Sequence, residues 1–254
     1  MKIQYASDLH LEFGENSKWL GSNPIIPSAD ILVLAGDIGY LGDDNYSTHP
    51  FWDRVSKDFQ QVIVIPGNHE LYKFFDINEL HVGWQIDIRH NVKVCYNCVV
   101  PLDSETDLIA STLWAKIPEY EEFLTERCVS DFKRIRNGDF RLSSRRFNVE
   151  HDRCLQFIKK AVNESKARNI IVVTHHVPSF FLMSEEFKDS SINGAFTVEL
   201  SDYIENSRID YWIYGHSHRN IDAVIGKTSC TSNQLGYVFQ NEHFSFRRDA
   251  IIDV

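Results

Sequence analysis

The sequence contains few cysteines, and nothing in their spacing suggests a set of disulfides. Five cysteines occur among 254 residues, an odd number that leaves at least one thiol unpaired. Cys95 and Cys98 form a CxxC motif, but the chain has no second CxxC to complete a four-cysteine zinc site. We therefore predict reduced, buried or half-buried thiols, because free cysteine commonly packs as a small hydrophobic side chain. A redox pair is the alternative for Cys95 and Cys98.

Long apolar runs and targeting patterns are also missing. No stretch approaches the roughly 18 consecutive apolar residues that a membrane span needs. Met1 and Lys2 lead directly into a strand-like run, without the charged start, apolar middle and cleavage site of a signal peptide. From these absences we expect a cytoplasmic protein with no membrane partner.

Positive charge is in short supply. Lys and Arg total 26 against 36 Asp and Glu, which gives a net charge of −10. This balance is unfavourable for sequence-independent binding of long nucleic acid, which depends on phosphate contacts from basic residues. Bound divalent cations would invert the local field of clustered carboxylates, so a small anionic substrate could still be attracted. The composition specifies no oligomeric state.

Internal repeats, linkers and low-complexity tracts are absent too, so we predict one domain over residues 1–254 with a cap or insertion at 115–148. Strand-like apolar runs lie at Lys2–Ser7, Ile31–Ala35, Gln61–Ile65, Leu108–Thr112, Ile170–Thr174, Tyr211–Tyr214, Ala223–Ile225, Thr228–Ser232 and Ser245–Val254. Helical patterning covers Phe51–Phe59, Tyr120–Ile135, Val149–Lys166 and Val198–Ile204. Strands that alternate with helices indicate an α/β fold, and the closely spaced last strands indicate an antiparallel portion.

What the chain does have is a series of short polar motifs directly after apolar runs. They are Asp8-Leu9-His10, Gly36-Asp37, Gly67-Asn68-His69-Glu70, His175-His176 and Gly215-His216-Ser217-His218. Carboxylate, amide and imidazole ligands delivered by several strand ends to one sheet edge are typical of a two-metal hydrolytic site. Six of the eleven histidines lie in these motifs, and we expect ordinary surface or packing roles for the other five.

The first motifs offer oxygen and imidazole ligands. Asp8 and His10 are one residue apart, so in a continuing strand they would share a face and reach one cation. Asp37 follows a glycine that permits a tight turn, and its two carboxylate oxygens can bridge two metals. An ordinary turn aspartate is the alternative for Asp37. Asn68 offers a neutral oxygen, which leaves the adjacent His69 free for proton transfer.

The remaining motifs carry further imidazoles. We expect one of His175 and His176 to bind metal and the other to cap the pocket or to be structural. His216 and His218 repeat the one-residue spacing, and imidazole suits transition metals. For Glu70 the simplest interpretation is an acid in the first turn of a helix, where the helix dipole favours it.

Taken in order, DxH, GD, GNHE, H and GHxH resemble the calcineurin-like metallophosphoesterase superfamily, and the resemblance spans Asp8 to His218. It implies a four-layer αββα sandwich, with two mixed β-sheets flanked by helices and the site at strand ends. By the match, one metal would be bound by Asp8, His10 and His218, the other by Asn68, His175 and His216, with Asp37 as the bridge. His69 matches the catalytic histidine of the family.

The resemblance also implies a reaction. A hydroxide held between two divalent cations (Mn, Fe, Zn or Ni) would attack a phosphodiester or phosphomonoester in line, with His69 assisting the leaving group. The motif at Gly36-Asp37 is not followed by the DRG of protein Ser/Thr phosphatases. The pattern therefore looks closer to the branch of small phosphohydrolases and cyclic-nucleotide phosphodiesterases.

Two other functions stay open at this stage. A nuclease of the same superfamily would need a basic path, and Lys133–Arg146 is the one local candidate. A non-catalytic scaffold on this fold is the other alternative, although every signature position is filled. Metal-dependent turnover of any phosphoester would dismiss the scaffold hypothesis.

Residues 115–148 are the least predictable stretch. Their aromatic content argues against disorder, so we predict an ordered, partly helical cap near the metal site, packed through its aromatics. Its arginines could contact phosphate in place of the missing DRG motif. The candidate substrate contacts are Asn68, His176, Arg141 and Arg145. The alternative is a remote face with solvated charges.

Overall fold

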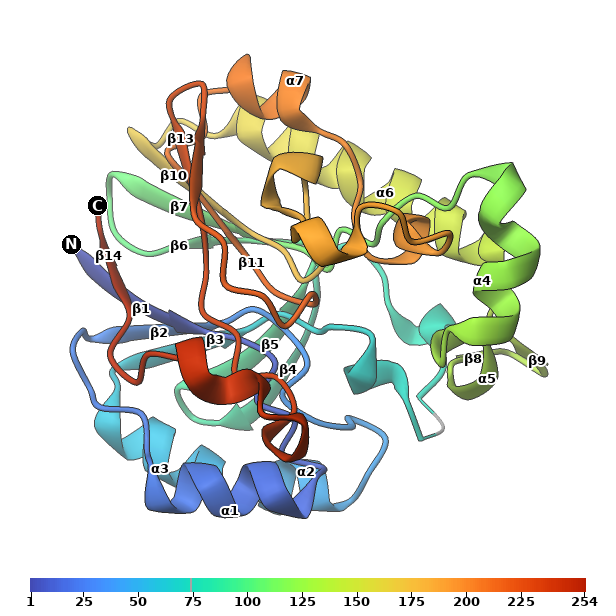
Figure 1. Ribbon diagram of the computed structural model, residues 1–254. Helices are drawn as coiled ribbons and strands as arrows, with labels where there is room; N and C mark the ends of the chain where they lie inside the picture. The colour runs from blue at the N-terminus through green and yellow to red at the C-terminus, as the bar shows by residue number, and fades with distance from the viewer. Residues whose placement is uncertain (74) are drawn as a thin grey trace.

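Two six-stranded mixed sheets lie face to face between two layers of helices (Figure 1). The computed structural model describes residues 1–73 and 75–254. Its arrangement confirms the predicted four-layer αββα sandwich. Within the described residues, no helix is both long and apolar enough to cross a membrane.

The first sheet has the strand order β14-β1-β2-β3-β5-β4. Its parallel centre consists of β1 (Lys2–Ala6), β2 (Ile31–Leu34), β3 (Gln61–Val64) and β5 (Val92–Tyr96). The antiparallel edges are β14 (Ile251–Asp253) and β4 (Trp84–Arg89). Its outer face is covered by α1 (Gly14–Ser22), α2 (Asn45–Thr48) and α3 (Pro50–Asp58) (Figure 1).

The second sheet has the order β12-β13-β11-β10-β7-β6. Its parallel strands are β7 (Thr106–Ala110), β10 (Asn169–Val173), β11 (Tyr211–Tyr214) and β13 (Thr228–Ser232). The antiparallel edges are β6 (Cys98–Pro101) and β12 (Ala223–Ile225). Its outer face is covered by α6 (Ser144–Glu164) and α7 (Ser201–Glu205) (Figure 1).

Alternate residues of the central strands pack into different cores, as the two-residue period of a strand requires. Val33 and Ile171 belong to the core between the sheets. Their neighbours point the other way: Leu32 packs in the cluster that contains Trp52 of α3, and Val172 packs in the cluster under α6. Burial on both faces explains why these strands are continuous apolar runs.

The predicted elements differ from the observed ones in a few places. The run Ser245–Val254 forms a strand only at β14, and the predicted helix Tyr120–Ile135 is divided into α4 (Glu122–Cys128) and α5 (Asp131–Arg134). Strands β4, β5 and β6 and helices α1 and α2 were not predicted. Helix α1 gives a weak signal because it contains two glycines and its N-cap residue, Phe13, makes no side-chain capping bond.

The segment 115–148 is built from short elements. After a 3-10 turn at Glu119–Glu121 come α4, α5 and a two-stranded ribbon of β8 (Arg136–Asn137) and β9 (Phe140–Arg141), and then the start of α6. Phe132 and Phe147 in this segment are buried, as is the flanking Trp114, whereas the exposed aromatics are Tyr120, Phe123 and Phe140. The prediction that the segment packs through its aromatic side chains therefore holds for only some of these side chains.

The cysteines of the CxxC motif lie on consecutive strands that belong to different sheets. Cys95 in β5 and Cys98 in β6 are buried, and both are free thiols. Both packed reduced thiols and an unoxidised redox pair are consistent with this placement.

Candidate metal centre

The polar motifs follow the carboxyl ends of β1, β2, β3, β10 and β11, so both sheets deliver side chains to one region. In α/β sheets this edge is the usual place for ligand binding. The motif residues do not continue the strands. Positive backbone φ angles occur at Asp8 (54°), His10 (48°), Asp37 (55°), His216 (77°) and His218 (53°).

The expectation that strand alternation aligns Asp8 with His10 was therefore wrong in its reason. Strand β1 ends at Ala6, and left-handed turns bring the two side chains together instead. A left-handed conformation at a non-glycine residue costs of order 1–3 kcal/mol and tends to occur at functional sites.

Two motif glycines are required by close approach. A Cβ at Gly36 would lie 2.4 Å from Nδ1 of His175, and a Cβ at Gly67 would lie 2.2 Å from Oδ1 of Asp37. Gly36 also has a φ of +91°. Each glycine thus lets its loop pack directly against a candidate ligand from another loop.

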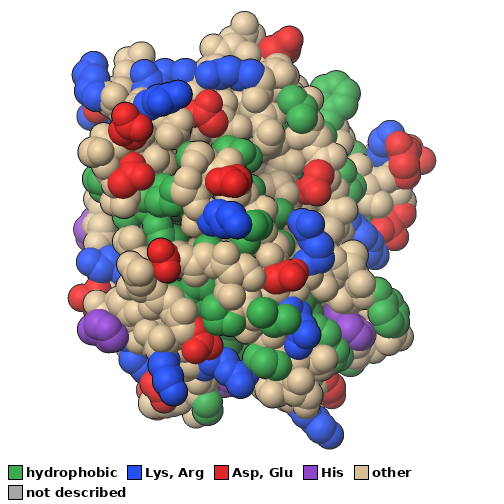
Figure 2. Space-filling view, turned by 90° about the vertical axis from the view of Figure 1, so that its left-hand side faces the viewer, with side chains coloured by type: hydrophobic (Ala, Val, Ile, Leu, Met, Phe, Trp, Pro, Cys, Tyr) green, Lys and Arg blue, Asp and Glu red, His purple; other side chains and the backbone are tan. Residues whose placement is uncertain are grey.

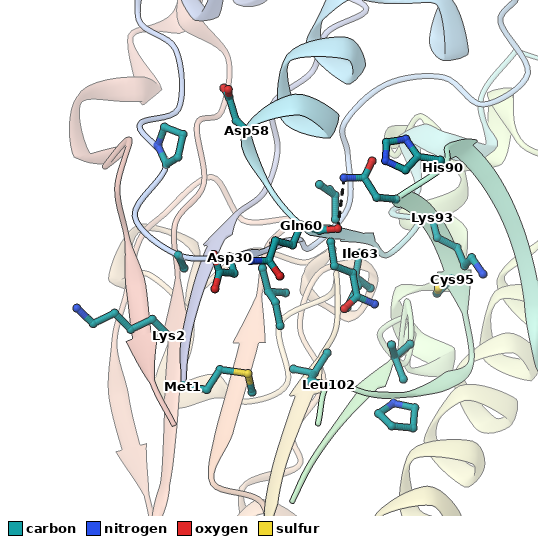
Figure 3. Close-up of a pocket in the computed structure, with 18 of the residues that line it drawn as sticks. Met1, Lys2, Asp30, Asp58, Gln60, Ile63, His90, Lys93, Cys95 and Leu102 are labelled. Atoms are coloured by element: carbon teal, nitrogen blue, oxygen red, sulfur yellow. Dashed lines mark hydrogen bonds between the residues drawn. The ribbon is translucent and has the colours of Figure 1, made fainter. Parts of the chain in front are cut away.

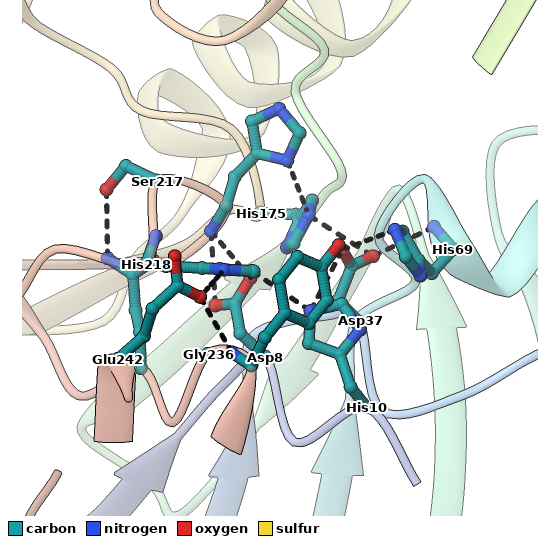
Figure 4. A network of polar contacts seen from close by, with 12 residues as sticks. Asp8, His10, Asp37, His69, His175, Ser217, His218, Gly236 and Glu242 are labelled. Carbon is teal, nitrogen blue, oxygen red and sulfur yellow. Dashed lines mark hydrogen bonds and ion pairs between the residues drawn. The ribbon is translucent and has the colours of Figure 1, made fainter. Parts of the chain in front are cut away.

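One group of candidate ligands combines Asp8, His10 and His218, whose donor atoms lie within 4.8 Å of one another. Nε2 of His218 is 3.0 Å from Nε2 of His10 and 3.4 Å from Oδ1 of Asp8. Figure 4 shows these side chains pointing toward one another. Asp8 also accepts the backbone N–H of His216, which ties the loops after β1 and β11 together.

A second group surrounds His175. Its Nε2 lies 3.0 Å from Oδ1 of Asn68, 3.0 Å from Nδ1 of His216 and 3.3 Å from Oδ1 of Asp37. Asp37, His175 and His216 also fall within 4.8 Å of one another through their donor atoms. All four residues are buried.

Asp37 lies between the two groups. Its Oδ1 faces His175 at 3.3 Å, while its Oδ2 lies 3.9 Å from Nε2 of His10 and 3.9 Å from Nε2 of His69. Its pKa is held well below the ordinary range, because the opposing effect of burial is outweighed by the surrounding histidines. Asp37 is therefore a carboxylate with one oxygen directed to each group.

Three of the candidate histidine ligands are hydrogen-bonded at Nδ1 to a carboxylate or a backbone carbonyl that is not itself a candidate ligand, and this contact fixes the tautomer of the neutral ring. Nδ1 of His218 donates to Glu242 at 2.7 Å, Nδ1 of His10 donates to Glu12 at 3.1 Å, and Nδ1 of His175 donates to the Ala35 carbonyl at 2.9 Å. Acceptors at Nδ1 leave a lone pair at Nε2 in each neutral ring. This is the arrangement that metal-binding histidines commonly have.

The Nε2 atoms and carboxylate or amide oxygens that face the centre are suitable ligands for divalent cations. His10 and His218 are both held at Nδ1, so in their neutral forms the two Nε2 lone pairs face each other at 3.0 Å. This contact is repulsive unless a cation or an added proton lies between the two nitrogens. The Nε2 atom of His175 faces two oxygens that can only accept. Mixed imidazole and oxygen donors suit Mn, Fe, Zn or Ni.

His69 lies beside the two groups. Its Nδ1 bonds to Glu12 at 2.7 Å, so a single carboxylate holds both His69 and His10. Burial would raise the pKa of Glu12, but these two histidines lower it to about 2. Nε2 of His69 is directed toward Asp37, and His10, Asp37 and His69 also form a group of donors within 4.8 Å. The geometry therefore places His69 within reach of the same centre.

Glu70 does more than begin a helix. It lies in a 3-10 turn at His69–Leu71 and is fully buried. Its carboxylate accepts four backbone N–H groups, from Gly67 at 2.6 Å, Asp37 at 2.9 Å, Ile38 at 2.7 Å and Gly39 at 3.2 Å. Glu70 thus joins the loop after β2 to the loop after β3, and the expectation of a simple first-turn acid was incomplete.

Among the candidate substrate contacts other than Asn68, His176 lies beside the candidate ligands His175 and His216. His176 is fully buried and has ring neighbours at Trp114 and His216, and neither of its ring nitrogens has a hydrogen-bond partner within the described residues. Burial is the main reason that its pKa lies well below the ordinary value. His176 is thus closed to solvent beside the candidate ligand His216, and its contact with substrate stays a prediction.

The arginines of segment 115–148 differ in whether they lie near the centre. Arg141 and Arg145 are exposed, and neither is joined to the centre by a hydrogen bond or ion pair in the described part of the chain. Arg146 instead pairs with Glu150 of its own helix. Arg134 is the exception: its guanidinium lies 4.7 Å from the ring centroid of Tyr72, and the Tyr72 ring lies 4.5 Å from the ring of His69.

A wide groove at the other end of the sheets is separate from the centre. It has a volume of about 1310 Å³ and is lined by residues at the amino ends of β1, β2 and β3, among them Lys2, Asp30 and Gln60 (Figure 3). None of the candidate metal ligands lines it. Its acidic residues Asp30 and Asp58 are exposed and remain accessible to water.

Several residues of the site were missed by sequence reasoning. Glu12 could have been found, because DxHxE places a third polar side chain two residues after His10. Glu242 and Asp131 gave no local signal, since each lies far along the chain from the side chain that it contacts.

The family model for the calcineurin-like phosphoesterase matches residues 1–220. The uncharacterized protein L509 of Acanthamoeba polyphaga mimivirus is 28% identical over 284 residues, which cover 99% of this chain and 96% of the viral protein.

Two solved structures share the fold. Phosphopantetheinyl hydrolase (PptH) from Mycobacterium tuberculosis superposes with a TM-score of 0.67 at 17% identity, covering 96% of this chain and 93% of that chain. The protein TT1561 of Thermus thermophilus gives a TM-score of 0.52 at 12% identity, with coverage of 92% and 88%.

Proposed function

This chain belongs to the calcineurin-like phosphoesterase family and is a metal-dependent phosphoesterase, and we propose that it uses two divalent cations to hydrolyse a small phosphodiester or phosphomonoester. One cation would be held by Asp8, His10 and His218, the other by Asn68, His175 and His216, and both by Asp37. When bound, a pair of such cations lowers the pKa of a shared water and offsets charge on phosphoryl oxygens.

One observation carries the two-cation proposal: the position of Asp37. Each of its carboxylate oxygens is directed to a different group of imidazoles, at 3.3 Å from His175 and at 3.9 Å from His10. A single-cation site would need only one of these groups. A carboxylate whose two oxygens point to different sites is well suited to bridge neighbouring cations.

His69 is the proposed proton donor to the leaving oxygen. Glu12 holds its Nδ1, so the free Nε2 is directed toward the centre between Asp37 and His10. Positioned acid catalysis of this kind contributes about 10²–10⁴-fold to a rate.

Arg134 is the proposed contact for the anionic substrate. Its guanidinium stacks on Tyr72 at 4.7 Å and on Tyr40 at 5.4 Å, one aromatic ring away from His69. Within the described residues, Arg134 forms no ion pair with an acidic side chain, and its guanidinium donates a hydrogen bond to the hydroxyl of Tyr40. A guanidinium with free donors at the rim of the site matches phosphate geometry.

Turnover with controlled metal content tests the proposal. The protein is treated with chelator, Mn²⁺ is restored, and rates are measured on bis-p-nitrophenyl phosphate and p-nitrophenyl phosphate. We expect hydrolysis only with restored metal, and the ratio of the two rates reports the preference for diester or monoester. Asp37→Asn should abolish hydrolysis. Asp58→Asn, which changes an exposed carboxylate in the remote groove, should leave hydrolysis unchanged. Turnover that survives chelation would contradict the proposal.

A nuclease of the same family is the second candidate, and the net charge of −10 disfavours it. On the face where the termini lie, which is the face of the remote groove, lysine and arginine side chains are interspersed with acidic ones (Figure 2). Of the basic stretch Lys133–Arg146, Arg146 is already paired with Glu150. Oligonucleotide binding that weakens steeply with added salt would favour the nuclease instead.

A further inference from the structure

We propose that Asp131, from helix α5 of segment 115–148, is a positioning residue for the metal centre: its carboxylate orients the amide of Asn68 so that the amide oxygen faces the cation held by Asn68, His175 and His216. The inference rests on the proposed two-cation site. It gives segment 115–148 a role in building the centre, in addition to any contact with substrate.

The geometry begins with a buried carboxylate. Asp131 is only 1% exposed. Its Oδ1 accepts hydrogen bonds from Nδ2 of Asn68 at 2.8 Å and from the hydroxyl of Tyr72 at 2.5 Å. On the other side of the same amide, Oδ1 of Asn68 lies 3.0 Å from Nε2 of His175.

This contact fixes which way the amide points. An asparagine amide presents an oxygen acceptor on one side and an NH₂ donor on the other, and the two orientations differ only in their hydrogen bonds. A carboxylate accepts only, so it holds the NH₂ group of Asn68 and leaves the oxygen on the side of His175. The reversed amide would place two donors where a cation requires a lone pair.

Structural stability alone does not account for Asp131. Within the described residues, it forms no ion pair with a basic side chain, and its Oδ2 is buried without a hydrogen-bond partner. Burying such a group is costly. A cation beyond Asn68 would offset that cost, as outer carboxylates do at metal sites.

The test compares variants at Asp131 by metal binding, measured by calorimetric titration of chelated protein with Mn²⁺ and by metal content. Asp131→Leu removes the acceptor but fills the space, and we expect one of two cations to bind about 10–100-fold more weakly while the other is unaffected. Asp131→Asn keeps an oxygen for both donors, so it should retain binding close to that of the unmodified protein. Asp131→Ala gives the same expectation as leucine if the leucine variant fails to fold.

Glu121→Ala is the matched control. Glu121 is also buried in this segment, and its carboxylate accepts the backbone N–H of Gly194 at 2.8 Å. It touches no candidate ligand, so its loss should loosen the segment without changing the affinity for either cation.

Two results would overturn the inference. One is unchanged binding of both cations by Asp131→Leu and Asp131→Ala. The other is equal loss in these variants and in Glu121→Ala, which would indicate general loosening of the segment. If the unmodified protein binds no pair of cations, the proposed function itself fails, and that outcome is recognised before any variant is compared.

Discussion

Three of the four histidines in the two groups have a partner at Nδ1 that selects one tautomer, and His216 is the exception because its Nδ1 faces Nε2 of His175. Where Nδ1 meets a carboxylate or a carbonyl, as in His10, His175 and His218, the Nε2 atom of the neutral ring keeps its lone pair. The outer partners therefore select the tautomer as well as the position of each ring. Nδ1 of His69 also meets a carboxylate, Glu12, so His69 differs from these rings in its position and not in its outer partner.

The role assigned to His69 predicts a loss of rate without a loss of metal. Because His69 is placed outside the ligand set, His69→Ala should keep both cations and lower kcat by about 10²–10⁴-fold, the range for positioned acid catalysis. Metal content and kcat on bis-p-nitrophenyl phosphate are measured on the same sample. His90→Ala, an exposed histidine of the remote groove, is the control. A variant that loses a cation would make His69 a ligand instead.

Arg134 predicts an effect on substrate binding. If it contacts a phosphoryl oxygen, Arg134→Ala should lower kcat/KM by an amount equivalent to about 1.5–3 kcal/mol, the range for hydrogen bonds to charged groups. Arg145→Ala, an exposed arginine with no contact to the centre, should change it by less than about twofold.

The remaining arginines of the segment complete this test. Arg136→Ala, Arg141→Ala and Arg146→Ala are measured beside the first two variants. If none of the five raises KM or lowers kcat/KM beyond about twofold, segment 115–148 is not a substrate cap for the ester assayed.

Residue-level prediction from sequence was strongest for side chains in local motifs. Asp8, Asp37 and His216 stand directly after apolar strands, and that position alone brought them to one edge. Their outer partners depend on tertiary contacts: Glu242 reaches His218 from a different loop, and Asp131 reaches Asn68 across 63 positions of sequence. No periodicity or spacing encodes such contacts.

At the scale of elements, the loops after β2 and β3 are joined by one buried carboxylate. Glu70 accepts backbone N–H groups from Gly67, Asp37, Ile38 and Gly39. Asp37 in turn accepts the backbone N–H of His69 at 2.9 Å. The bridging carboxylate and the catalytic candidate are therefore held in one cross-linked pair of loops.

Replacing Glu70 should destabilise the protein even without metal. Glu70→Gln places amide donors against backbone donors and leaves buried N–H groups unsatisfied, at about 1–3 kcal/mol for each group. Denaturant unfolding of chelated protein measures the effect apart from cation binding, which would itself add stability. Glu79→Gln, an exposed acid nearby, is the control. An unchanged unfolding midpoint for Glu70→Gln would show that the loops do not depend on it.

The elements found from sequence are those with the simplest signals. Continuous β-branched runs such as Ile170–Thr174 indicate strands buried on both faces, and β10 was located to within one residue at each end. The hairpin of β4 and β5 was missed, although residues 84–88 alternate between half-buried and exposed positions as an edge strand does. The predicted helix Tyr120–Ile135 was divided because the chain is extended at Val129.

For the whole molecule, the central feature is that two sheets share one site. The loops after β1, β2 and β3 come from the first sheet, and the loops after β10 and β11 come from the second. Asp37 faces His175 across the boundary between them. Bound cations would therefore join the two halves of the sandwich as well as serve the reaction.

Metal stoichiometry tests this account most directly. Protein purified without chelator is analysed for metal content, and its cation positions are located by anomalous scattering after soaking in Mn²⁺. We predict two adjacent cations per chain, with greater loss of metal in Asp37→Asn than in Asp8→Asn, because Asp37 faces both groups and Asp8 only one. A single, fully occupied site that stays single after Mn²⁺ soaking would contradict the two-cation centre.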